Sequence, residues 1–321
     1  MMKTITPVWH CNFSHEIHLL CLNLNRYKVL SVDTEFPGFL RDTPRDAPAA
    51  ILYDDLKFNV DNTNIIQLGI TLMDDHGDIG PTWEFNFKFD LEKETHVQSS
   101  IEFLKKSGLD FQKIKQDGIP MNVFVMNFLK ILAMHRNLKW VTFHGTYDLA
   151  HVLKLFTCET LLPNTARDFA AKASSFFNKL VDLKLAAKYS EGLKDVEVGL
   201  AKLSRILHVR RLGEAHNAGS DSLLTAQVYA KMMDHIGDGS LEGILYGLED
   251  VRIGRMYKPR FVIRLPHPYP HPYPMPVQLG PCATYTMSFI PQIPVHQHGG
   301  NYVAPMEPQP CYFMPLPHVM M

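Results

Sequence analysis

The first third of the chain has the alternation of hydrophobic and polar residues that is typical of β-strands. Three such segments occur, at residues 27–36, 64–74 and 82–90. Every second residue of the third is aromatic, namely Trp83, Phe85, Phe87 and Phe89. These four rings should share one face, because side chains two residues apart on a strand point the same way. The polar stretch DDHGDIGP at 74–81 supplies a turn, so the segments predict a meander at the start of a sheet.

Beyond residue 98 the apolar residues mostly recur every three or four positions, which indicates helices. Helices are predicted at 99–108, 121–135, 146–156, 166–178, 196–207 and 220–233. The first should be capped by Ser99 or Ser100. A further strand is predicted at 139–145. Strands followed by helices that pack around them predict an α/β layered domain.

The composition changes sharply after Arg264. Residues 265–321 contain 14 of the 22 prolines, repeat HPYP twice, and hold no Lys or Arg. Proline cannot donate to a hydrogen-bond ladder, so we predict one folded domain at 1–264 and a disordered proline- and histidine-rich tail at 265–321. The tail's five histidines lack a spacing that would preorganise a metal site. A docking role through polyproline-II recognition stays open.

The charges of the chain nearly cancel, with 32 Lys and Arg against 33 Asp and Glu. A polyanionic partner must therefore be met by local basic residues. The candidates are Lys105, Lys106, Arg210 and Arg211, each of which could also be a solvated surface residue. Five cysteines without a CxxC pair argue against a disulfide framework and a zinc ribbon. No apolar run approaches the roughly 18 residues of a membrane span, and we expect a soluble, intracellular protein.

Asp33 and Glu35 lie one residue apart in the stretch VLSVDTEFPGFL, on one face of a predicted strand. Charges in such a setting are costly unless something compensates them. An irregular surface edge would explain an isolated pair. Two more acids occupy positions where α/β sheets build sites: Asp148 follows the strand at 139–145, and Asp221 lies in the first turn of the last helix. Each of these could instead favour a helix dipole, with Ser220 as the cap in the second case.

His216 lies five residues before Asp221, in the glycine-containing loop HNAGSD. A lone histidine is more often structural, but an imidazole just ahead of a carboxylate suits a general base. Four acids and one histidine have the composition of a two-metal site with a base. Oxygen ligands without thiolates favour Mg²⁺ or Mn²⁺ over Zn²⁺.

The order of these motifs, DxE, then YD, then HxxxxD, resembles the DEDD exonuclease superfamily in its histidine branch, DEDDh. Longer strings are similar to the CCR-associated factor or Pop family of poly(A) deadenylases, the smaller nuclease subunit of the CCR-NOT complex. These strings are VDTEFPG, NIIQLGITLMD, TWEFNFKF, SIEFLKKSG, WVTFHGTYD and HNAGSDSLLT. The resemblance covers about residues 10–250. This chain has GTYD where the family usually has SGYD, and HNAGSD where it commonly has HQAGSD, and both changes keep the ionisable residues.

The resemblance implies a ribonuclease-H-like fold with a central mixed β-sheet flanked by helices. It also implies two bound divalent ions, Mg²⁺ or Mn²⁺. Their implied ligands are Asp33, Glu35, Asp148 and Asp221, with Asp33 bridging both ions. His216 would be the base that accepts the proton of a water molecule. Phe36 is a candidate substrate contact, with core packing as the alternative.

The implied activity is that of a metal-dependent 3′-to-5′ exoribonuclease that shortens the poly(A) tail of mRNA, releases AMP and initiates mRNA decay. The implied partners are the 3′ end of single-stranded poly(A) RNA, the CCR-NOT scaffold and its second deadenylase subunit. Two alternatives remain: a non-catalytic adaptor that binds the scaffold, and a DEDDh nuclease acting on DNA or structured RNA. We expect the protein in both cytoplasm and nucleus.

Overall fold

The computed structural model describes residues 4–44, 47–157, 161–190, 198–233, 236 and 241–254. The predicted domain limit at Arg264 and the predicted tail at 265–321 lie outside the described residues. Within the described part, no helix is long and apolar enough to cross a membrane.

A mixed sheet of six strands forms the centre of the described chain. In spatial order the strands are β1 (Ile5–Val8), β4 (Ile79–Asn86), β3 (Gln67–Met73), β2 (Val29–Glu35), β5 (Lys139–Thr142) and β6 (Lys179–Asp182). Strands β2, β3 and β4 pair antiparallel, whereas β1 with β4, β2 with β5, and β5 with β6 pair parallel. The predicted meander is therefore confirmed, and it forms the middle of a larger mixed sheet.

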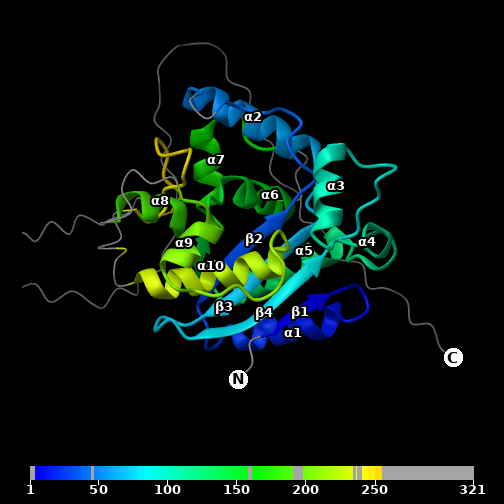
Figure 1. Cartoon of the computed structure of the whole chain (residues 1–321), viewed down its shortest axis with the longest axis horizontal. Coiled ribbons are helices and arrows are strands. Elements are labelled where there is room, and N and C mark those ends of the chain that lie inside the picture. The colour runs from blue at the N-terminus through cyan, green and yellow to red at the C-terminus, as the bar shows by residue number, and fades with distance from the viewer. Residues whose placement is uncertain are drawn as a thin grey trace, which may run out of the picture. The chain divides into compact units, whose positions relative to one another are not determined.

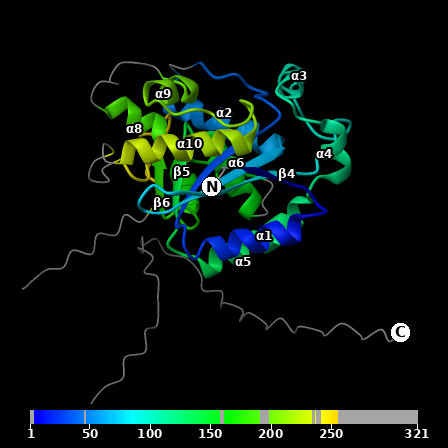
Figure 2. The ribbon, with the colours of Figure 1, turned by 60° about the horizontal axis from the view of Figure 1, so that its bottom comes forward.

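Ten helices are described along the chain (Figure 1). They are α1 (Phe13–Asn23), α2 (Ala49–Asn62), α3 (Gln98–Lys106), α4 (Phe111–Asp117), α5 (Met121–Met134), α6 (Thr146–Thr157), α7 (Ala166–Ala173), α8 (Leu183–Tyr189), α9 (Leu200–Ile206) and α10 (Ala218–Met232). Figure 2 shows α10 on one side of the sheet and α1 with α5 on the other. The predicted layered α/β architecture is confirmed.

Each face of the sheet has its own apolar core, and successive side chains of β2 point alternately into one core and the other. Leu30 and Val32 belong to the core that includes residues of α1, α5 and α6. Val29 belongs to the core that includes residues of α10. Because side chains alternate along a strand, Asp33 and Glu35 share the face of Val29. The two acids therefore face the side of the sheet covered by α10.

Several predicted boundaries were wrong. The strand predicted at 82–90 begins at Ile79, because the backbone N–H of Asp74 donates to the Asp78 carbonyl and closes the turn there. It ends at Asn86, although all four aromatic residues of the predicted set are buried. The strand predicted at 139–145 ends at Thr142, before His144 adopts a left-handed φ of 59°.

Predicted helix starts and caps also need correction. The helix at 99–108 begins at Gln98 with Val97 at the N-cap, so Ser99 and Ser100 lie inside its first turn. The last helix begins at Ala218 and not at 220. Ser220 does not cap it, since its hydroxyl donates to the carbonyl of Leu212. The helix predicted at 166–178 ends at 173, and the described part of the one predicted at 196–207 begins at 200.

Candidate active site

The two acids of β2 lie at the end of a central strand that loses one neighbour. Strand β5 pairs with β2 only along Val29–Ser31, whereas β3 pairs along all of Val29–Glu35. The last residues of β2 therefore have an open edge on the β5 side. Asp148 fills this edge: its Oδ1 accepts hydrogen bonds from the backbone N–H of Thr34 at 2.8 Å and from the Thr34 hydroxyl at 2.6 Å. Asp148 thus completes the ladder that β5 leaves unfinished.

Asp148 is carried on α6, directly after the turn that ends β5. Asp182 holds this turn, since its carboxylate accepts hydrogen bonds from the backbone N–H groups of His144 and Gly145 at 2.9 and 3.3 Å. The same carboxylate accepts from the N–H of Lys184 and of Tyr246. A buried acid with four N–H donors fixes where α6 begins, and hence where Asp148 lies.

Asp221 approaches the site because α10 begins directly on the sheet. Gly69 of β3 pairs in register with Asp33. A Cβ atom at Gly69 would lie 1.8 Å from the carbonyl oxygen of Ala218, the first residue of α10. Only glycine leaves room for this close approach, which brings the first turn of α10 alongside Asp33.

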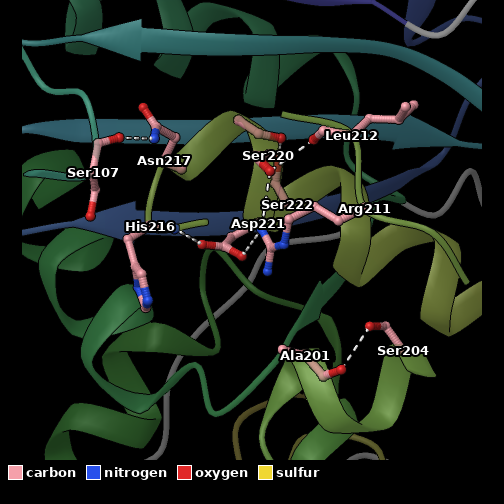
Figure 3. A network of polar contacts seen from close by, with 12 residues as sticks. Ser107, Ala201, Ser204, Arg211, Leu212, His216, Asn217, Ser220, Asp221 and Ser222 are labelled. Atoms are coloured by element: carbon pink, nitrogen blue, oxygen red, sulfur yellow. Dashed lines mark hydrogen bonds and ion pairs between the residues drawn. The ribbon is translucent and has the colours of Figure 1, made fainter. Parts of the chain in front are cut away.

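The loop before α10 is fixed by polar contacts (Figure 3). The backbone N–H of His216, whose φ is 62°, donates to Asp221 Oδ2 at 2.9 Å. Arg211 forms an ion pair with Asp221 Oδ1 at 2.5 Å. Asn217 Nδ2 donates to the carbonyl of Ser107 at 2.8 Å, which ties the loop to the chain just after α3.

Burial and neighbouring acids raise the pKa values of three carboxyl groups of the site. Burial raises the pKa values of Asp33 and Glu35 well above their ordinary values, and the charges of nearby acids raise them further. For Asp33 these acids are Asp148, Asp221 and Glu35, so the four predicted carboxylates lie within electrostatic reach of one another. Burial also raises the pKa of Asp148 to about 6, against the lowering effect of the two hydrogen bonds from Thr34.

Crowded carboxylates such as Asp33 and Glu35, whose pKa values are raised by burial and by the charges of nearby acids, are what a divalent cation would stabilise. Among the described residues, Glu35, His216 and Asp221 offer ligand atoms that all lie within 4.8 Å of one another. The carboxylate oxygens suit Mg²⁺ or Mn²⁺. The donor set therefore fits the predicted metal ions.

Phe36, predicted as a substrate contact, lies next to the acids and is only partly buried. Its ring stacks on those of Tyr147 and His151, with centroids 5.7 and 4.9 Å away. Of the four basic candidates, Arg211 lies in the site as the partner of Asp221, whereas Arg210, Lys105 and Lys106 are exposed.

Sequence reasoning missed three residues that support the site, namely Thr34, Asp182 and Phe103. It also missed that Arg211 pairs with Asp221. Phe103 on α3 is 47% exposed, and its ring packs edge-on against His216 with centroids 4.6 Å apart. A phenylalanine on the exposed face of a helix that carries charged residues could have been noticed in the sequence. Its contact with His216 could not, because the two residues lie about a hundred positions apart in the chain.

Fold and site together define a carboxylate-rich hydrolase site on a mixed α/β sheet. The CAF1 family ribonuclease profile matches residues 8–122 and 125–229. The chain belongs to the CAF1 ribonuclease family, which confirms the predicted resemblance and its ribonuclease-H-like fold class.

Two curated relatives and two solved structures illustrate this kinship. Probable CCR4-associated factor 1 homolog 5 of Arabidopsis thaliana is 42% identical over 229 residues, which are 70% of this chain and 81% of the relative. Poly(A) ribonuclease pop2 of Schizosaccharomyces pombe is 34% identical over 77% of this chain and 76% of its own length. The solved structure of S. pombe Pop2p, in a Mg²⁺- and Mn²⁺-bound form, matches with a TM-score of 0.69 over 76% of this chain and 99% of that one.

A second solved structure contains CAF1 co-crystallised with the yeast NOT1 MIF4G domain. It matches with 26% identity and a TM-score of 0.65, over 76% of this chain and 96% of that one.

Proposed function

We propose that this chain is a 3′-to-5′ exoribonuclease that removes AMP from the poly(A) tail of mRNA with the help of two Mg²⁺ or Mn²⁺ ions. The observation that carries the proposal is the convergence of Asp33, Glu35, Asp148 and Asp221 beside His216. Kinship with a poly(A) ribonuclease, and with a Pop2 structure that holds Mg²⁺ and Mn²⁺, supports the substrate and the metals.

In this proposal the four carboxylates hold the ions, which when bound would stabilise charge on the phosphate and acidify a water molecule. A neutral imidazole nitrogen of His216 accepts the proton of that water. Thr34 holds Asp148 through two hydrogen bonds, and Arg211 offsets part of the charge of Asp221.

We further propose that the chain binds a NOT1-type scaffold and works beside a second deadenylase subunit of a CCR-NOT complex. The co-crystal of CAF1 with the yeast NOT1 MIF4G domain supports the first of these partners. A location in both cytoplasm and nucleus stays a prediction.

The test uses the purified full chain with 5′-labelled oligo(A), oligo(U) and single-stranded DNA in Mg²⁺. Oligo(A) should be shortened from its 3′ end, and more rapidly than the other two. Asp33→Ala and Asp221→Ala should each abolish hydrolysis, because each removes a metal ligand, while the circular dichroism spectrum stays that of the parent protein. Full activity in either variant would contradict the proposed site.

The two alternatives give different results in this assay. An adaptor would never shorten oligo(A) at any Mg²⁺ or Mn²⁺ concentration, yet would bind the scaffold. A nuclease for other substrates would prefer DNA or structured RNA over oligo(A).

A further inference from the structure

The loop Phe36–Arg41, which follows β2, is held in place from both sides. On the α3 side, the backbone N–H of Val97 donates to the Pro37 carbonyl at 2.9 Å. Gly38 packs so closely there that a Cβ atom would lie 2.1 Å from Ser100 Oγ. Figure 1 shows the chain leaving β2, passing α3 and returning to α2.

On the α2 side, Asn59 fixes the far end of the loop. Its side chain accepts a hydrogen bond from the backbone N–H of Arg41 at 2.8 Å and donates one to the Arg41 carbonyl at 2.9 Å. Asn59 is 1% exposed, so this pairing is a buried clamp. Because the backbone of this loop is already fixed, a ligand that binds there need not order it, which lowers the entropic cost of binding.

Phe39 is the aromatic side chain that this loop presents to solvent, with 47% of the residue exposed. Its ring stands nearly perpendicular to those of Phe36 and Tyr147, at centroid distances of 5.3 and 4.7 Å. Phe36 follows Glu35 in the chain, and Tyr147 precedes Asp148. The exposed ring therefore rests on an aromatic pair that directly adjoins the catalytic carboxylates.

Arg41 adds a second flat surface two residues further on. Its guanidinium carbon lies 3.6 Å from the centroid of the Phe58 ring, and its side chain is 51% exposed. Asp55 lies 3.6 Å from the guanidinium and shares its charge. Arg41 thus offers a supported plane with a partly compensated charge, which suits a base better than a phosphate.

We propose that Phe39 and Arg41 form a stacking site for bases of the single-stranded RNA that lie on the 5′ side of the nucleotide being removed. Aromatic rings and guanidinium planes are the surfaces on which unpaired bases stack. Residues two apart have Cα atoms at most about 7 Å apart, so neighbouring bases can use both surfaces. Every base has such a face, so the site supplies affinity without selecting adenine. The inference rests on the proposed nuclease function.

The first test compares Phe39→Ala with the parent chain on oligo(A) of ten nucleotides and on the dinucleotide ApA. For the long substrate KM should rise about five- to a hundredfold, the range that loss of one stacked base gives, with kcat unchanged. For ApA, whose single base on the 5′ side of the removed nucleotide can fill at most one of the two surfaces, KM should rise by a smaller factor than for the long substrate. Phe39→Trp should keep the parent KM, and Arg41→Ala should act like Phe39→Ala. Tyr189→Ala on α8 is the matched control, because Tyr189 is an aromatic residue with 54% exposure outside the site.

A second test replaces single nucleotides of the long substrate by abasic ones. At the stacked position the parent chain and Phe39→Ala should have equal KM values, because the base that the ring would contact is missing. Equal losses on ApA and the long substrate, or no loss on the long one, would overturn the stacking site. If the parent chain hydrolyses no oligo(A), the proposed function fails, and binding of labelled oligo(A) to Asp33→Asn and to Asp33→Asn with Phe39→Ala still tests the loop.

Discussion

At the scale of single residues, Gly69 has more influence on this site than its size suggests. It pairs with Asp33 in the sheet, and the carbonyl of Ala218 occupies the space that a Cβ atom would need. Position 69 contributes no chemistry of its own. It sets how closely the first turn of α10, with Asp221, can approach the acids of β2.

We predict that Gly69→Ala lowers both stability and activity. The new methyl group must push α10 away from the sheet, and overpacking of this kind costs about 1–3 kcal/mol. For a domain of this size that corresponds to a fall in Tm of about 2–12 °C. Activity should fall more than stability does, because Asp221 moves away from Asp33. The measurements are a thermal melt and the rate of oligo(A) hydrolysis at a temperature where both proteins are folded.

Gly199→Ala is the control for this substitution. Gly199 precedes α9, has no left-handed φ, and a Cβ atom there would meet nothing within 4 Å. Because Gly199 is the N-cap residue of α9, where alanine is less favourable than glycine, Tm should fall slightly, whereas the rate of hydrolysis should not change. A Gly69→Ala protein with the parent's Tm and rate would show that α10 can shift without consequence.

At the scale of secondary-structure elements, the sequence predicted best those features that repeat within one segment. The meander strands and helices α5, α6 and α10 each carry a long apolar period, and all were found. Strand β1 was missed because it has four residues, one of them Pro7, and pairs only at the sheet edge. Strand β6 and helices α1, α2, α4 and α8 were also missed. Boundaries failed where a contact between distant segments decides them, as at the end of β5, where Asp182 accepts hydrogen bonds from the N–H groups of His144 and Gly145.

The candidate site likewise contains residues that the sequence revealed and residues whose role depends on contacts between distant segments. The acids and His216 were visible because ionisable residues in apolar or glycine-containing stretches are unusual. Their supports were not visible, because Thr34 contacts Asp148 and Phe103 contacts His216 across about a hundred residues of chain. Such pairs exist only once the elements have packed.

We predict that α3 acts through Phe103 as a positioning element for His216. Phe103→Ala removes the ring that packs against the imidazole, so His216 should sample orientations that cannot accept the proton. The expected result is a fall in kcat of about tenfold with little change in KM, since a misplaced group loses rate rather than binding. Phe103→Leu should retain part of the rate. Met126→Ala on α5, where Met126 is 63% exposed, is the control and should behave like the parent. A rise in KM without a fall in kcat would instead assign Phe103 to substrate binding.

At the scale of the whole molecule, the site is a source of instability that metal ions should remove. Asp33, Glu35 and Asp148 all have pKa values above their ordinary range in the folded chain. Through these three groups the folded state binds more protons than the unfolded state once the pH exceeds about 4, whereas buried His151, with its pKa lowered from 6.5 to about 3, has the opposite effect below about pH 6.5. The contribution of the three acids to the free energy of unfolding must decrease as the pH rises.

The last prediction follows from this pH dependence of the free energy of unfolding. In a chelator, the Tm of the parent relative to that of Asp33→Asn should fall as the pH rises from 4.5 to 8, a comparison in which His151 contributes equally to both proteins. For scale, Asp148 alone, with its pKa raised from 3.8 to about 6, lowers the free energy of unfolding by about 2 kcal/mol over this interval, at 1.36 kcal/mol per pKa unit. Mg²⁺ should restore Tm at pH 8 but have little effect at pH 4.5, because protonated carboxyls do not bind it. Asp33→Asn removes one of the repelling charges and one ligand, so both the fall with pH and the response to Mg²⁺ should be smaller. If the chelated parent and Asp33→Asn instead lost the same stability between these pH values, the acids would not be the cause, and the cluster would be stable without a cation.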